Sequence, residues 1–117
     1  MSHTAETINA TTTVVRIAPE ISTGKLDTVN ELRDLCRELE NQGMLHIVMD
    51  FSKVQHCPSV VFGNILVGEK RLLAKQGGFC LACFTPYVAK TARIIGVDQD
   101  VATFETVEQA LQALKTK

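Results

Sequence analysis

The sequence predicts an α/β fold built on a single layer of mixed, largely parallel sheet, with four to five strands and about four helices. Short apolar or β-branched runs of strand length alternate along the chain with longer segments of helical periodicity. Two of the short runs, residues 44–51 and 79–84, are mostly apolar on both faces, which is typical of parallel strands covered on both sides. Helical segments between such strands form crossover connections, so the strands that they join are parallel.

The first strand and the first helix are predicted by a β-branched run that gives way to apolar residues at helical spacing. Residues 11–18 are rich in β-branched side chains and predict a strand, which Pro19 closes. From Leu26 onward the apolar residues recur at helical spacing, at Leu26, Val29, Leu32, Cys36 and Leu39. Thr28 and Glu31 have the spacing of a capping box. Gly43 suits the left-handed conformation that follows a helix, so we expect the helix to end just before it.

The rest of the chain repeats this alternation. Residues 44–51 predict a strand in which Ile47, Met49 and Phe51 share one face. A polar loop over residues 52–58 leads into a helix over residues 59–76, and a strand over residues 79–84 follows. Thr85-Pro86 is a strong start signal for a helix that ends at Gly96. A short strand over residues 101–104 and a last helix, with Thr106 and Gln109 as its capping box, complete the pattern.

Length and composition fit one domain and exclude several classes of protein. A chain of 117 residues has the usual size of one domain, which we place at residues 11–117; residues 1–10 either form a flexible tail or add an edge strand. The formal net charge is −1, from 12 Lys and Arg against 13 Asp and Glu without a basic block, which argues against a nucleic-acid binder. No apolar run reaches the ~20 residues of a membrane span. No export signal is visible, so we expect a cytoplasmic protein.

The best-placed candidate for chemistry is Ser59. In open α/β sheets, sites collect at the carboxyl ends of strands and the amino ends of helices, and the loop from Asp50 to Ser59 joins two such ends. Ser59 follows Pro58 at the predicted N-cap, where a phosphate would meet unpaired N–H groups and the positive end of the helix dipole. A plain helix cap, which contributes about 1 kcal/mol, is the alternative. Asp50 either braces this loop or simply ends its strand.

An ordered set of motifs resembles the STAS domain family of bacterial anti-sigma-factor antagonists. The set comprises residues 48–54 (VMDFSKV), Pro58-Ser59, Gly63, Leu66, Gly77-Gly78, the Thr85-Pro86 helix start and the final Ala110, Leu111 and Leu114, and it extends over roughly residues 11–115. The resemblance implies the STAS fold and a phosphorylatable serine at Ser59. It also implies a partner that is both a serine kinase and an anti-sigma factor. The unphosphorylated form would bind this partner and release the sigma factor, and the phosphorylated form would let go.

The same resemblance implies a regulator that is not an enzyme, and it locates a partner surface around the loop and the following helix. We expect that surface to include Pro58, Ser59, Val60, Val61, Asn64, Val67, Gly68 and Arg71. The chain departs from the family pattern at Pro58, where the family has Asp, and at Val60 and Val61, where it has Ser and Gly. A STAS scaffold or accessory subunit of a signalling or transport complex, never phosphorylated, therefore stays open as an alternative.

Other reactive residues give weaker signals. Cys80 and Cys83 have C-x-x-C spacing, which makes a small thiol-redox protein the least favoured interpretation. On a strand the two sulfurs would point to opposite faces, so we expect both cysteines to serve packing. His56 and Cys57 stand beside Ser59, but no acid is placed to orient the histidine, and a metal site built on them and Asp50 lacks further ligands. The sequence therefore predicts no metal and no cofactor, and it carries no signal for the oligomeric state.

Overall fold

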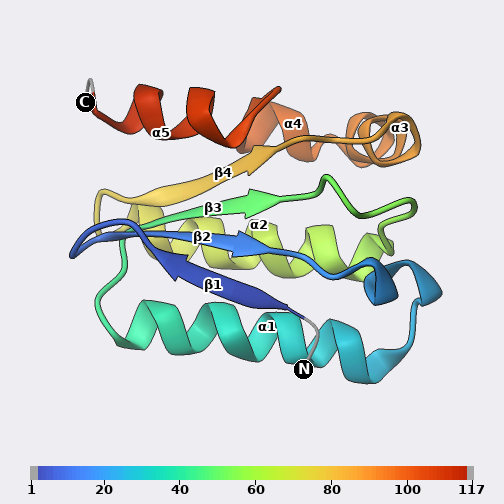
Figure 1. The fold of residues 1–117 in the computed structure, drawn as a ribbon, viewed down its shortest axis with the longest axis horizontal. Coiled ribbons are helices and arrows are strands. Elements are labelled where there is room, and N and C mark those ends of the chain that lie inside the picture. Colours follow the sequence, from blue (N-terminus) through green and yellow to red (C-terminus); the bar gives the residue numbers. More distant parts are fainter. Residues whose placement is uncertain (1–2, 116–117) are drawn as a thin grey trace.

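A computed structural model describes residues 3–115, which form a five-stranded sheet with helices on both faces (Figure 1). The strands lie in the order β1-β2-β3-β4-β5. β1 (Thr4–Thr7) pairs antiparallel with β2 (Thr12–Arg16), and all other neighbours pair in parallel. The remaining strands are β3 (His46–Asp50), β4 (Gly78–Ala82) and β5 (Ala102–Phe104). The predicted α/β fold with one largely parallel sheet is confirmed.

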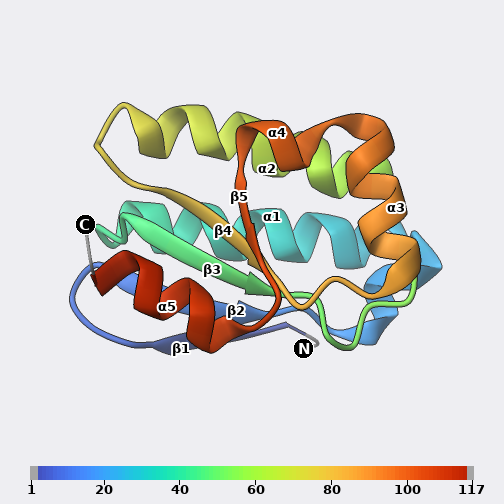
Figure 2. The ribbon, with the colours of Figure 1, turned by 90° about the horizontal axis from the view of Figure 1, so that it is seen from above.

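The helices divide unequally between the two faces of the sheet. A short 3-10 helix, η1 (Pro19–Thr23), follows β2, and α1 (Leu26–Asn41), α2 (Ser59–Leu73), α3 (Pro86–Ile95) and α4 (Val97–Asp100) follow in chain order. These four α-helices pack on one face, and α5 (Val107–Lys115) covers the other face, as Figure 2 shows. The strand connections through α1 and α2 are therefore the expected crossovers.

The core consists of two hydrophobic clusters, one on each side of the sheet. β3 shows the division most clearly, because Ile47 and Met49 belong to the larger cluster beneath the helices whereas Val48 belongs to the smaller one beneath α5. All three side chains are fully buried. The expected alternation along this strand is confirmed, and it fixes which side of the sheet each helix must cover.

Several helix ends differ from the sequence prediction. The capping box at Thr28 and Glu31 is wrong: α1 begins at Leu26, as the periodicity predicts, with Lys25 at its N-cap, and the Thr28 hydroxyl donates to the Lys25 carbonyl at 2.9 Å. The box at the start of α5 is confirmed in its first half, because Thr106 Oγ1 accepts from the Gln109 N–H at 3.1 Å. Neither α4 nor η1 was predicted, and both are shorter than the periodic patterns that a sequence reveals. Within residues 3–115, no helix has the length and apolar character needed to cross a bilayer.

One close approach lies where the chain passes from α2 into β4. Gly77 connects the end of α2 to β4, and a Cβ atom at this position would collide with the backbone carbonyl oxygen of Leu45. The following residue, Gly78, donates its N–H to the same oxygen at 2.9 Å. The glycine pair predicted as a helix stop therefore also lets the chain pass tightly beside Leu45 on its way from α2 into β4.

Candidate functional site

The loop between β3 and α2, residues 51–58, is anchored in the core. Phe51, Val54 and Cys57 are buried at 0%, 0% and 6% exposure, so every third side chain of the loop points inward. The Phe51 ring contacts the rings of Phe62 and Phe84, with centroids 5.9 Å and 5.1 Å away. Three buried anchors restrict the conformations that this loop can adopt.

Hydrogen bonds from three side chains, those of Asp50, Ser22 and Thr85, hold the backbone of this loop. Asp50 Oδ1 accepts from the Ser52 N–H at 2.9 Å, at the start of the loop. Ser22 Oγ, in η1, accepts from the N–H groups of Gln55 and His56, both at 3.2 Å. From the opposite side the Thr85 hydroxyl, at the N-cap of α3, donates to the Val54 carbonyl at 2.7 Å. Thr85 thus occupies the predicted cap position, but its hydroxyl holds the loop and does not cap α3.

Ser59 lies at the first residue of α2 and is exposed. The N-cap is Pro58, whose φ of −58° and ψ of 142° are extended, so the prediction of Ser59 as the N-cap is wrong by one residue. A proline preceding the helix turns the chain into it while lacking an N–H of its own. Within the described residues the Ser59 hydroxyl has no hydrogen-bond partner. It is thus open to solvent at the amino end of a fifteen-residue helix.

The other predicted surface residues fall into two groups. Val60 and Val67 are 50% and 57% exposed and lie on the outer side of α2. Pro58 and Asn64 are half-buried. Val61 and Gly68 are buried, which corrects their assignment to a partner surface: Val61 belongs to the main core, and a Cβ at Gly68 would come within 2.8 Å of the Phe79 ring.

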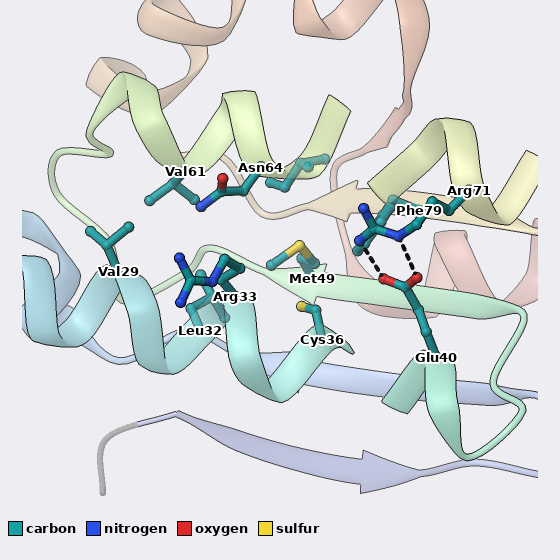
Figure 3. A pocket seen from close by; sticks show the side chains of 11 residues that line it. Val29, Leu32, Arg33, Cys36, Glu40, Met49, Val61, Asn64, Arg71 and Phe79 are labelled. Carbon is teal, nitrogen blue, oxygen red and sulfur yellow. Dashed lines mark hydrogen bonds and ion pairs between the residues drawn. The ribbon is translucent and has the colours of Figure 1, made fainter. Parts of the chain in front are cut away.

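Arg71 also has an internal role. Its guanidinium makes two hydrogen bonds with Glu40 of α1, at 2.8 Å and 3.0 Å, and Figure 3 shows this pair bridging the gap between α1 and α2. The Glu40 side chain is only 6% exposed, whereas Arg71 is 34% exposed. The adjacent cavity, lined by Cys36, Met49 and Asn64 among others, measures about 30 Å³. That is room for a water molecule and far below the size of a small-molecule site.

Two exposed side chains that the sequence analysis missed extend the surface onto α3. Tyr87 and Ile94 are 62% and 75% exposed, and they lie on the outer side of a helix that packs against α2. The Tyr87 ring contacts the ring of His56, with centroids 4.8 Å apart, which connects α3 to the loop before Ser59. The spacing of seven residues between Tyr87 and Ile94, opposite the buried Val88 and Ala92, was the available signal.

The thiols are not arranged for catalysis. Cys80 lies within the smaller core cluster, and Cys83 packs against the same cluster. The predicted divergence of the two sulfurs is wrong because Cys83 lies beyond the end of β4 in a left-handed conformation, with φ of 65°. Burial, and then the nearby Asp50 carboxylate, raise the pKa of Cys83, which is the opposite of what a reactive thiol needs. Burial likewise raises the pKa of Cys57 to about 12.

The potential metal-ligating side chains of residues 3–115 are dispersed. Among residues 3–115 no three His, Cys, Asp or Glu side chains are close enough together to hold an ion. The site is therefore a surface: a fixed loop, an exposed hydroxyl at a helix start and exposed apolar side chains on two adjacent helices.

Comparisons with known proteins identify a family by sequence and a shared fold by structure. A family model described as the STAS domain matches residues 3–110. The anti-sigma factor antagonist SpoIIAA in its unphosphorylated form has a similar structure, with a TM-score of 0.83 at 19% identity over 99% of this chain and 98% of that chain. The phosphorylated form, from Bacillus, gives 0.73 at 19% identity over 97% and 99%. A chain of the stressosome, described as a signal integration and transduction hub, gives 0.69 at 23% identity over 97% and 96%. No curated protein matches in sequence.

Proposed function

The chain belongs to the STAS domain family, and on this premise we propose that it is a regulatory protein, not an enzyme, that binds a serine-kinase anti-sigma factor in the cytoplasm. Phosphorylation of Ser59 switches this binding off. The observation that supports the switch is the exposed, unpartnered hydroxyl of Ser59 at the first residue of α2. A kinase can reach this group without unfolding the helix. SpoIIAA, with the same fold, is known in an unphosphorylated and a phosphorylated form.

The proposed switch works through desolvation and charge at the interface. Unphosphorylated Ser59 offers a partner a small neutral group beside the apolar Val60, which is 50% exposed. Phosphorylation adds about −1.5 to −2 charge there. The bound partner would have to strip water from this dianion, and this cost reduces affinity by a few kcal/mol, where ~1.4 kcal/mol is a factor of ten. The released partner is then free to hold its sigma factor.

The loop before Ser59, residues 51–58, is held in place by hydrogen bonds and buried side chains, and this restricts how the phosphate can act. Ser22 and Thr85 hold the loop from two other elements, and three buried side chains anchor it. Such a loop has little freedom to rearrange, so the phosphate acts at the contact surface directly and not by refolding the domain. We therefore expect the fold to be the same in both states.

The experiment is phosphorylation in vitro with the anti-sigma kinase from the same cells. Incubation with ATP is expected to add one phosphate, detected by intact mass, and the variant Ser59→Ala is expected to take none. Ser52→Ala, an exposed serine in the same loop, is the matched control and keeps the modification. Absence of phosphate on Ser59, together with unchanged partner binding by Ser59→Glu, removes the switch.

The second candidate function is a scaffold or accessory subunit that is never phosphorylated. Pro58 favours it, because this residue replaces the family's Asp beside the serine, and the half-exposed Val60 favours constitutive association. The likeness to a chain of the stressosome is consistent with this role. Recovery of a partner that lacks a kinase fold, with equal affinity for the wild type, Ser59→Ala and Ser59→Glu, would favour the scaffold.

A further inference from the structure

The charged residues are divided unequally along the chain. Residues 51–96 contain six of the 12 Lys and Arg residues but only one of the 13 Asp and Glu residues, which is Glu69. This segment therefore carries a net +5, and the remainder of the chain carries −6, consistent with the total of −1. The segment includes the loop before Ser59, α2 and α3, so the whole candidate surface comes from the basic part of a nearly neutral protein.

The structure leaves most of these cations unpaired on the surface. Glu69 is 7% exposed and accepts from the Phe79 N–H at 2.7 Å, so it contributes no accessible negative charge. Arg71 is paired with Glu40. The other five cations are exposed and form no ion pair with any residue among 3–115; they are Lys53, Lys70, Lys75, Lys90 and Arg93.

Exposed apolar side chains are interleaved with these cations. On α3, Tyr87, Lys90 and Ile94 follow one another at intervals of three and four residues and lie along one outer stripe. On α2, Val60, Val67 and Lys70 follow one another at intervals of seven and three residues and also lie on one outer side. α3 packs against α2, so these exposed side chains come from two neighbouring helices. We call this surface the α2–α3 face; its residues are Val60, Val67, Lys70, Tyr87, Lys90, Arg93 and Ile94.

The opposite charge prevails on α1. Its exposed residues Asp27, Glu31, Asp34 and Glu38 recur at intervals of four, three and four and form an acidic stripe. The basic character is therefore local to the α2–α3 face and is not a property of the whole surface. A localised field of this kind steers a partner of opposite charge and selects against partners of the same charge.

We propose that the α2–α3 face docks a protein surface on which acidic side chains flank apolar ones, as on an acidic amphipathic helix. This inference rests on the proposed function, which makes the face a protein-binding surface, and it adds the partner's chemistry. Val60, Val67, Tyr87 and Ile94 supply apolar contact, and the unpaired cations meet the partner's carboxylates. Nucleic acid is the weaker candidate, because the three cations of this face are dispersed among apolar side chains and do not follow a phosphate backbone. A lipid surface is also weaker, because the cations lie between the apolar residues and not around them.

The test uses defined probes and does not involve Ser59 or a kinase. The isotope-labelled chain is titrated with a designed helical peptide carrying Leu at one-turn intervals flanked by Glu, and with a matched peptide that has Lys in place of Glu. Duplex DNA and phosphatidylglycerol vesicles serve as further arms. The Glu peptide is expected to bind, to shift the amide signals of α2 and α3, and to bind about tenfold more weakly when the salt is raised from low to physiological concentration.

Two charge variants make the test specific. Lys90→Glu with Arg93→Glu reverses two cations of the α2–α3 face and is expected to weaken binding of the Glu peptide at least about tenfold. Lys25→Glu with Arg37→Glu makes the same change in net charge at exposed positions near α1, and it is expected to leave the affinity within about twofold.

Any of three results would overturn the inference: binding of neither peptide, binding of the Glu peptide outside α2 and α3, or preferential binding of DNA or vesicles at this face. Because no arm depends on phosphorylation, these results are independent of whether Ser59 accepts a phosphate. Conversely, failure of the kinase experiment leaves the peptide result unaffected.

Discussion

Replacing Arg71 by Met separates a structural role for this residue from the partner-binding role that the sequence predicted. Arg71 donates two hydrogen bonds to Glu40, whose side chain is only 6% exposed. Met keeps much of the length of the side chain but leaves the Glu40 carboxylate buried without its cation. Loss of one partner of a buried ion pair costs about 3–5 kcal/mol, and because Arg71 is 34% exposed we expect a smaller loss, about 2–3 kcal/mol.

Urea denaturation measures the free energy of unfolding that Arg71→Met loses. A double-mutant cycle with Glu40 shows whether the loss comes from this ion pair. Replacing Glu40 by Met in the Arg71→Met background removes the stranded charge, so most of the lost stability should return. The matched control is Lys70→Met, one residue earlier on α2 and exposed without an ion pair to any residue among 3–115, which should change stability by less than about 0.5 kcal/mol. Should Arg71→Met prove as stable as this control, the pair does not hold α1 to α2 and the reasoning fails.

Three further predictions concern the loop, the glycines and the thiols. Thr85→Val removes the 2.7 Å hydrogen bond to the Val54 carbonyl of the loop, so the free energy of unfolding should fall by about 1–3 kcal/mol. Amide exchange in residues 52–58 should accelerate; unchanged exchange would contradict the inference that Thr85 restrains the loop. Gly77→Ala should destabilise strongly because its Cβ meets a backbone oxygen, whereas Gly63→Ala, in open space on α2, should stabilise by up to about 1 kcal/mol in urea melts. Burial raises the pKa of Cys36 and Cys57 from 9.0 to about 12, so the native state retains protons that the unfolded chain releases. The free energy of unfolding should therefore fall as pH rises from 9 to 12, and Cys57→Ala should flatten the slope.

The fold was predictable where a periodic pattern is long enough to reveal a face. The alternation of Ile47, Val48 and Met49 between two cores is visible in the sequence, because both sides of a parallel strand must be apolar. α4 has only four residues and η1 five, so neither completes a recognisable period. For β1, the exposed residues Thr4–Thr7 carry no hydrophobic signal, and only their pairing with β2 shows an edge strand where the sequence left two alternatives.

The position of the site along the chain was predictable, but which of its side chains face solvent was less so. Strand-loop-helix order alone brought Ser59 to the start of α2. The burial of Val61 and Gly68 had a usable signal, because with Ile65 and Leu72 they recur at intervals of four, three and four. The role of Arg71 had none, since Glu40 lies 31 residues away and only the packing of α1 beside α2 brings the two together. Long-range pairs of this kind require tertiary structure.

The charge distribution constrains how a phosphate at Ser59 can act. A dianion at this position lowers the net charge of residues 51–96 from +5 to about +3, so the surface stays basic. Reversal of the field therefore cannot explain release of an acidic partner. Under the proposed switch the short-range effect must dominate: the phosphate would meet the partner's carboxylates at contact distance, where like charges cost several kcal/mol. It follows that Ser59→Glu, with one charge and a shorter reach, should weaken binding less than the phosphate does. High salt should weaken binding of both forms without erasing the difference between them, because desolvated contacts are screened little.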